Sequence, residues 1–101
     1  MRTGFIGAGK VGITLGAYFR SGGIKISGYY SRSERSAQKA GALTSSTVFN
    51  NMGDLLLNSD FIYITTPDDA VNEVWNEISR YHIEGKYIIS TSGSLTSDVF
   101  Y

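Results

Sequence analysis

The chain has no cysteine, and this absence excludes several kinds of chemistry. Without thiols it can form no disulfide, no thiolate metal site and no cysteine nucleophile. It has one histidine, His82, with no partner near it in the sequence, so we interpret it as a surface loop residue rather than a catalytic group. The sequence therefore predicts no metal site. The lack of thiols also fits a protein of the reducing cytoplasm.

Net charge and long apolar runs are also lacking. Nine Lys and Arg residues balance nine Asp and Glu residues, so the basic surplus that binding to nucleic acid or an anionic membrane needs is missing. No stretch approaches a membrane span, and the N-terminus, Met1-Arg2-Thr3, has no apolar core of the signal type. We expect a cytoplasmic protein with one domain over residues 1–101, and neither nucleic acid nor a membrane as a partner.

Glycine, by contrast, is abundant, and three glycines near the N-terminus follow the spacing G-x-G-x-x-G. Gly7 permits a tight turn off a strand, Gly9 lets a pyrophosphate approach the backbone, and Gly12 lets a helix pack close to the strand. The helix that follows offers unpaired N–H groups and the positive end of its dipole to an anion. The predicted phosphate-binding residues are Gly7, Ala8, Gly9, Lys10, Val11 and Gly12.

The surrounding chain gives this motif the context that it needs. Residues 3–6 are predicted to form a strand before the glycines, and residues 24–30 a second strand. Between them the apolar side chains of Val11, Leu15, Tyr18 and Phe19 recur at helical spacing. Strand, glycine turn, helix and strand follow one another within about 30 residues, as a βαβ unit requires.

The end of the second strand indicates which dinucleotide is bound. A NAD-binding domain usually has an acidic residue there, about 20 positions after the last glycine. Counting from Gly12, 32 − 12 = 20 positions lead to Arg32, within the run Tyr30, Ser31, Arg32 and Ser33, and no carboxylate occurs before Glu34. An arginine binds phosphate with two charge-assisted hydrogen bonds. We therefore predict NADP rather than NAD, the alternative being that Arg32 is a solvated loop residue.

Two other ligand classes fit this strand end less well. Sites for flavin adenine dinucleotide and for S-adenosylmethionine also favour an acidic residue at this position, and none is present. Ser31 and Glu34 form an S-x-x-E pattern, which predicts that Ser31 caps a helix over residues 34–40, ended by Gly41.

The second half of the chain continues to alternate strands and helices. The stretch 61–65 is nearly continuously apolar, which is typical of a central parallel strand buried on both faces. A helix is predicted from Pro67 to about Arg80, with a buried stripe of Val71, Val74, Trp75 and Ile78. The other predicted elements are a short strand within 43–48, a brief helix over 50–57 and a strand over 86–90.

These elements predict the α/β class, with a doubly wound parallel sheet of strand order 3-2-1-4-5, no sixth strand, and a ligand site at the carboxyl edge where the order reverses. The first loop would hold the pyrophosphate and the second the adenine ribose. The loop with Thr65, Thr66, Pro67 and Asp68 would border the nicotinamide ribose. The loop with Thr91, Ser92 and Gly93 would lie near the nicotinamide.

Four segments together resemble a known group of enzymes. These segments, residues 7–12, 30–33, 59–69 and 91–94, look like the N-terminal half of the 6-phosphogluconate dehydrogenase-like superfamily, and the likeness covers essentially the whole chain. Within it, the sequence is most similar to Rossmann-like NADP oxidoreductases of poorly defined substrate, described as of the short-chain or the F420-dependent type, and pyrroline-5-carboxylate reductase is a more distant relative. The resemblance implies NADP binding and hydride transfer to or from a small carbonyl or imine substrate.

Enzymes of this superfamily usually continue into a helical C-terminal domain that supplies dimer contacts and groups for substrate binding or catalysis. We therefore expect the chain to be a truncated cofactor domain, inactive by itself and able to form homo-oligomers through the apolar surface left uncovered. The sequence assigns no catalytic residue. The alternative hypothesis is a non-catalytic module that senses NAD(P) and acts with a partner, since it would need the same loops.

Overall fold

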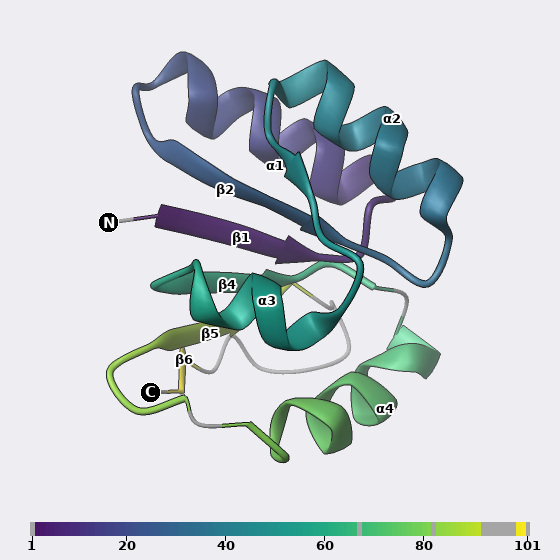
Figure 1. Cartoon of the computed structure of the whole chain (residues 1–101), viewed down its shortest axis with the longest axis vertical. Coiled ribbons are helices and arrows are strands. Elements are labelled where there is room, and N and C mark those ends of the chain that lie inside the picture. Colours follow the sequence, from purple (N-terminus) through teal and green to yellow (C-terminus); the bar gives the residue numbers. More distant parts are fainter. Residues whose placement is uncertain (1, 67, 82, 92–98, 101) are drawn as a thin grey trace.

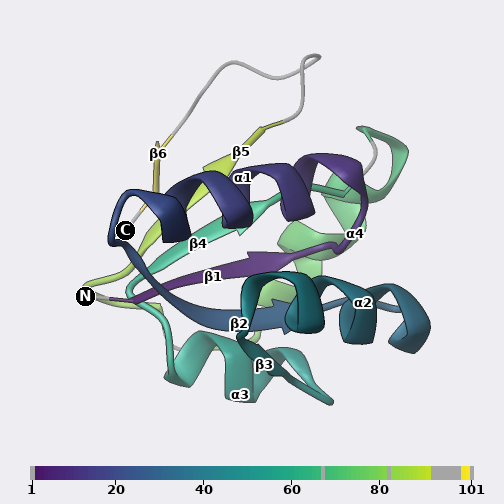
Figure 2. The same ribbon diagram turned by 90° about the horizontal axis from the view of Figure 1, so that it is seen from above.

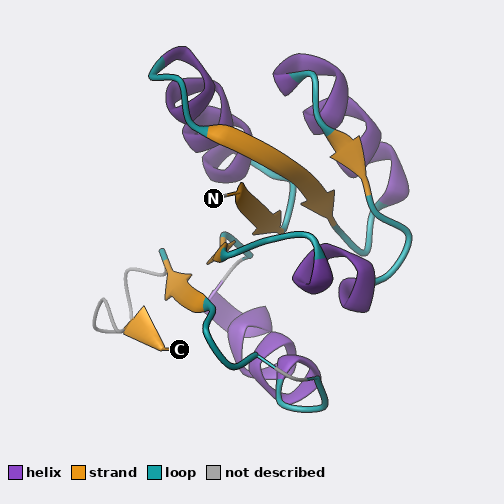
Figure 3. Ribbon diagram, turned by 60° about the vertical axis from the view of Figure 1, so that its left-hand side comes forward, coloured by secondary structure: helices purple, strands orange, loops and turns teal. Residues whose placement is uncertain are grey.

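A computed structural model describes residues 2–66, 68–81, 83–91 and 99–100. One sheet lies between two layers of helices, as Figures 1 and 3 show from two sides. The elements are β1 (Arg2–Ile6), α1 (Lys10–Ser21), β2 (Lys25–Tyr30), α2 (Glu34–Thr44), β3 (Thr47–Val48), α3 (Met52–Leu57), β4 (Phe61–Ile64), α4 (Asp68–Ile78), β5 (Tyr87–Ser90) and β6 (Val99–Phe100).

The strand order in the sheet is β3-β2-β1-β4-β5-β6. The first five strands are parallel, which confirms the predicted order 3-2-1-4-5. β6 pairs antiparallel with β5, so the prediction of no sixth strand was wrong. Two residues after a polar loop carry no alternating pattern, and their pairing depends on where the chain returns along the edge of the sheet.

Each face of the sheet carries its own apolar cluster. On one face α3 and α4 contribute Met52, Leu55, Leu56, Val71, Val74 and Ile78, which pack against Ile6, Ile62, Ile64 and Ile88, with Trp75 beside them as predicted. On the other face α1 and α2 cover Phe5 and Tyr29 with Ala37, Ala40 and Phe19. Burying apolar area on both faces is what stabilises a parallel sheet.

β4 departs from the prediction of burial on both faces. Ile62 and Ile64 are buried, whereas Phe61 and Tyr63 are only half-buried. Phe61 stacks on Tyr87 of the neighbouring strand, with ring centroids 5.0 Å apart. The unbroken apolar run therefore combines one buried face with one aromatic face that remains partly accessible.

α1 turns toward the sheet only part of the face that was predicted from apolar spacing. Val11 and Tyr18 are exposed, at 51% and 73%, while the buried residues of the helix are Gly12 and Gly16. The hydrophobic pattern does not reveal the face with Gly12 and Gly16, because glycine adds little apolar area. Glycine nevertheless allows the helix backbone to approach the sheet most closely. Leu15 and Phe19 pack beside this glycine seam, as predicted.

Tyr29 holds α1 against the sheet. Its hydroxyl donates a hydrogen bond of 2.7 Å to the carbonyl of Gly12, and its ring stacks on Phe5 with the centroids 4.9 Å apart. Burial raises the pKa of Tyr29 to about 12, and the hydrogen bond with Thr44 opposes this rise. The hydroxyl is therefore protonated, and able to donate, throughout the physiological range.

α2 begins at Glu34 as predicted, but its N-cap residue and its end differ from the prediction. Its N-cap is Ser33, whose Oγ accepts from the N–H of Ser36, because the helix begins at Glu34 and the residue directly before it takes the capping position. Ser31 was therefore wrongly predicted as the cap. Gly41 does not end the helix; a Cβ there would lie 2.8 Å from Val48, so this glycine serves close packing, and Ser45 forms the left-handed C-cap.

Within the described residues no helix is long and apolar enough to cross a membrane. Nor do these residues contain a group of three or more His, Asp or Glu that could hold a metal ion.

The Gly16 contact leads to a prediction. An added Cβ would lie 1.9 Å from the Tyr29 hydroxyl oxygen. Gly16→Ala should therefore destabilise the chain by about 1–3 kcal/mol, although alanine in an open helix position gains about 1 kcal/mol over glycine. Thermal unfolding followed by circular dichroism would measure the change. The double variant Gly16→Ala/Tyr29→Phe should recover part of the loss, and a stabilising Gly16→Ala would contradict this packing.

Candidate functional site

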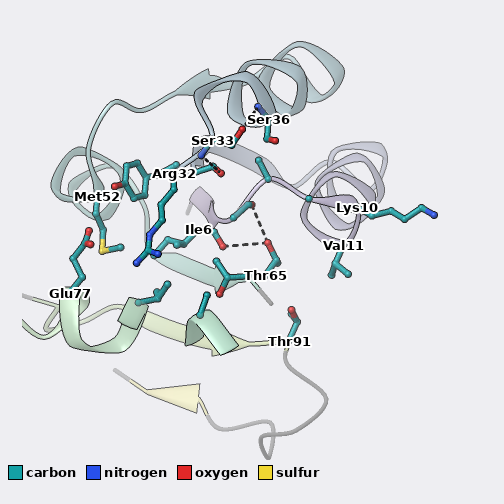
Figure 4. Close-up of a pocket in the computed structure, with 18 residues that line it drawn as sticks. Ile6, Lys10, Val11, Arg32, Ser33, Ser36, Met52, Thr65, Glu77 and Thr91 are labelled. Carbon is teal, nitrogen blue, oxygen red and sulfur yellow. Dashed lines mark hydrogen bonds between the residues drawn. The ribbon is translucent and has the colours of Figure 1, made fainter. Parts of the chain in front are cut away.

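A pocket of about 630 Å³ lies at the carboxyl edge of the parallel strands. α1 and α2 begin at this edge, on the right-hand side of Figure 2. A volume of this size suits a small ligand or part of a cofactor. The residues that line it, drawn in Figure 4, are Ile6, Gly7, Ala8, Gly9, Lys10, Val11, Tyr30, Ser31, Arg32, Ser33, Ser36, Met52, Thr65, Thr66, Ala70, Val74, Glu77 and Thr91.

The glycine turn between β1 and α1 is fixed from both sides. Gly7 has φ of 103°, a left-handed conformation that favours glycine. Its N–H donates to the carbonyl of Tyr30 at 2.8 Å, and its carbonyl accepts from Thr65 Oγ1 at 3.0 Å, one of the dashed contacts in Figure 4. β2 and β4 thereby hold the turn in place at the point where the strand order reverses.

The N-terminus of α1 is left free for an anion. The N-cap, Gly9, makes no side-chain hydrogen bond, and the first turn holds no acidic residue. α2 and α3 differ, since each has a side-chain cap, Ser33 or Asn51, and an acidic residue in its first turn. A Cβ built on Gly9 meets nothing within 4 Å. The backbone here is open to a ligand, and the helix dipole favours a negative charge.

The end of β2 supplies hydroxyl groups and one cation. The Oγ of Ser31 accepts from the N–H of Ser33 at 3.2 Å, and each serine hydroxyl keeps its own proton to donate. Burial, and then the nearby Glu77 carboxylate, raise the pKa of Tyr30, so its hydroxyl is neutral at physiological pH.

The guanidinium of Arg32 crosses toward α4. Figure 4 shows its side chain extending from the end of β2 toward the helix that carries Glu77. It forms an ion pair with Glu73 of that helix. The hydrogen bond to Glu73 raises the pKa of Arg32, which remains charged.

A threonine after β4 presents an unsatisfied polar group at the pocket. The Oγ1 of Thr66 is buried and has no hydrogen-bond partner in the part of the chain that the structure describes. Buried polar atoms are nearly always partnered, so an orphan at a pocket wall points to a ligand atom that would complete it. Thr91, after β5, is anchored to β4 by donating its N–H and its hydroxyl to the carbonyl of Ile64, each at 3.1 Å.

The structure brings most of the predicted site residues into one pocket. Three loops meet there: residues 7–11, residues 30–33, and Thr65 with Thr66; Thr91 joins them. Gly12 lies beneath the pocket instead, where a Cβ would come within 2.8 Å of both the Gly7 carbonyl oxygen and Thr65 Oγ1. Pro67, Ser92 and Gly93, like His82, lie outside the described residues, and of Asp68 only the backbone, at the start of α4, is described.

Six lining residues were not predicted: Ile6, Ser36, Met52, Ala70, Val74 and Glu77. Val74 had been assigned only to the buried stripe of its helix. Ala70, Val74 and Glu77 follow one another at spacings of four and three, so they share one helix face. Met52 begins α3, after the end of β3, and the rule that carboxyl ends of parallel strands share one edge could have indicated it.

Parallel strands in the order 3-2-1-4-5, with a pocket where the order reverses, define the Rossmann-type class of nucleotide-binding domains. The family model described as NADP oxidoreductase, coenzyme F420-dependent, matches residues 2–94, and the chain belongs to this family. A comparison with curated proteins gives no match.

Solved structures support the same fold. The chain is similar to 3-hydroxyisobutyrate dehydrogenase from Mycobacterium tuberculosis, with a TM-score of 0.78 and 16% identity over 90% of this chain and 31% of that one. An imine reductase from Pseudomonas sp. gives a TM-score of 0.74 and 20% identity over 90% and 32%. A reductive aminase from Aspergillus terreus, solved with NADPH, gives 0.74 and 15% over 90% and 31%. The chain thus spans about a third of the length of each.

The two glycines of the loop should respond differently to one added methyl group. Gly12→Ala forces a Cβ into the contact between α1, the glycine turn and Thr65, so we expect a loss of about 1–3 kcal/mol of stability. Gly9→Ala is the matched control, because its Cβ enters open space and its φ of −82° suits alanine. Chemical denaturation of both variants would test this, and equal stabilities would contradict the close helix contact.

Proposed function

We propose that the pocket binds NADP, and that the chain is the cofactor-binding domain of an oxidoreductase that transfers hydride to or from a small carbonyl or imine substrate. The observation that carries the proposal is that the uncapped N-terminus of α1 and the cationic Arg32 flank one pocket. The first suits a pyrophosphate, and the second suits the additional phosphate of NADP. Membership of an NADP oxidoreductase family supports it.

The chemistry of the pocket walls fits both parts of such a cofactor. Near the glycine turn the ligand would meet backbone N–H groups, serine hydroxyls and the unpartnered Thr66 hydroxyl. Between α3 and α4 it would meet Met52, Ala70 and Val74, which form an apolar surface suited to a flat base. A free phosphate would use only the first region and an apolar molecule only the second, so an elongated nucleotide fits best.

When bound, NADP supplies the nicotinamide ring that accepts or gives the hydride. The residues of this chain then serve to bind and orient it. The Gly9 backbone and the start of α1 would hold the pyrophosphate, Arg32 with Ser31 and Ser33 the 2′-phosphate, and Thr66 a ribose or phosphate oxygen. The proteins of similar fold are about three times as long, which supports placing the substrate groups of the whole enzyme outside this pocket.

Calorimetric titration with NADPH and NADH in parallel tests the cofactor. We expect NADPH to bind more tightly, because only NADPH carries the 2′-phosphate that Arg32 would bind. Arg32→Ala should weaken NADPH binding by about 10- to 100-fold, the effect of losing a charge-assisted hydrogen bond, and should leave NADH binding nearly unchanged. Arg20→Ala is the matched control, since this exposed arginine lies at the other end of α1. Equal affinities for the two cofactors would contradict the preference for NADP.

A larger side chain at Gly9 tests where the pyrophosphate lies. Gly9→Val places its side chain in the open space beside the start of α1, so it should abolish binding of NADPH and NADH alike. The same titrations measure the effect, and a melting curve close to that of the wild type would exclude misfolding. Unchanged binding would remove the glycine turn from the site.

A further inference from the structure

Arg32, the residue expected to hold the 2′-phosphate, already has an anionic partner. Its guanidinium pairs with the carboxylate of Glu73, which lies on α4, 41 positions further along the chain. Arg32 lines the pocket between the end of β2 and α4, and Glu77, one turn after Glu73, lines the same wall. Glu73 itself is not among the residues that line the pocket, so the ion pair joins the Arg32 guanidinium to α4 beside the space where the phosphate would bind.

Whether Arg32 binds Glu73 or the 2′-phosphate depends on the relative strengths of these two interactions. The side chains of Arg32 and Glu73 are 65% and 61% exposed. Ion pairs this exposed are weak, because water screens the charges and two long side chains must be held still. A phosphate can form two charge-assisted hydrogen bonds with the guanidinium and carries more charge than a carboxylate. A 2′-phosphate can therefore displace Glu73, but part of its binding energy is lost in doing so.

We propose that Glu73 is a specificity-determining residue that competes with the 2′-phosphate of NADP for Arg32 and so reduces the preference for NADP over NAD. This inference rests on the proposed function, since it requires NADP to bind beside Arg32. NAD has a hydroxyl in place of the phosphate and need not separate the pair. Glu73 therefore lowers the affinity for one cofactor and leaves the other nearly unaffected.

The variant Glu73→Gln tests the competition, because glutamine keeps the size of the side chain and removes its charge. In titrations of the 101-residue chain, NADPH should bind about 1.5- to 5-fold more tightly to this variant, the range set by the strength of an exposed ion pair. NADH affinity should change by less than about 1.5-fold. The gain should shrink as salt is added, since salt screens an exposed pair. Glu84→Gln, at an exposed position before β5, is the matched control and should change neither affinity.

Repeating the substitution in the Arg32→Ala background separates competition from direct repulsion. If Glu73 acts through Arg32, the double variant should bind NADPH within about 1.5-fold of Arg32→Ala alone. An equal gain in both backgrounds would overturn the proposal, because Glu73 would then simply repel the phosphate. Unchanged or weaker NADPH binding by Glu73→Gln would overturn it too, and weaker binding would mean that Glu73 orients Arg32. A wild-type chain that binds neither cofactor would contradict the proposed function itself.

Discussion

The arrangement of this molecule depends on how closely α1 approaches the sheet. The helix presents Gly12 and Gly16, where most helices present leucine or valine, and the Tyr29 hydroxyl and Thr65 occupy the space that side chains would otherwise fill. Because protein interiors are close-packed, α1 cannot shift relative to the sheet without clashing with its neighbours. The positions of the glycine turn, of β4 and of the start of α1 are therefore coupled to one another.

That coupling gives the pocket its electrostatic character. A helix that begins directly after β1, which pairs in parallel with β4, directs its unpaired N–H groups into the space where the strand order reverses. α2 and α3 satisfy their own first N–H groups with a serine or an asparagine side chain and add an acidic residue. Although the chain has no net charge, its charge is not evenly spread, and the start of α1 is a local site for an anion.

Much of this could be predicted from the sequence, because it depends on residues that lie close together in the chain. The glycine turn and the position of Arg32 follow from patterns within about 30 residues, and the strand order follows from the alternation of strands and helices along the chain. The buried face of α1 could not be predicted from apolar spacing, because glycine contributes contact without hydrophobic area. The role of Glu77 depends on where α4 crosses the sheet, and the pairing of Arg32 with Glu73 depends on two elements that are far apart in sequence.

The environment of Arg32 depends both on the local sequence and on the tertiary structure. The local pattern identifies a cation at the end of β2, and the tertiary structure adds a competing anion from α4. A cation that is already paired discriminates less between ligands than a free one, because binding must first break the existing pair. The cofactor preference of such a domain thus depends on the difference in strength between the arginine–phosphate interaction and the arginine–carboxylate ion pair. An arginine at this position favours NADP only to the extent that the phosphate interacts with it more strongly than the resident carboxylate does.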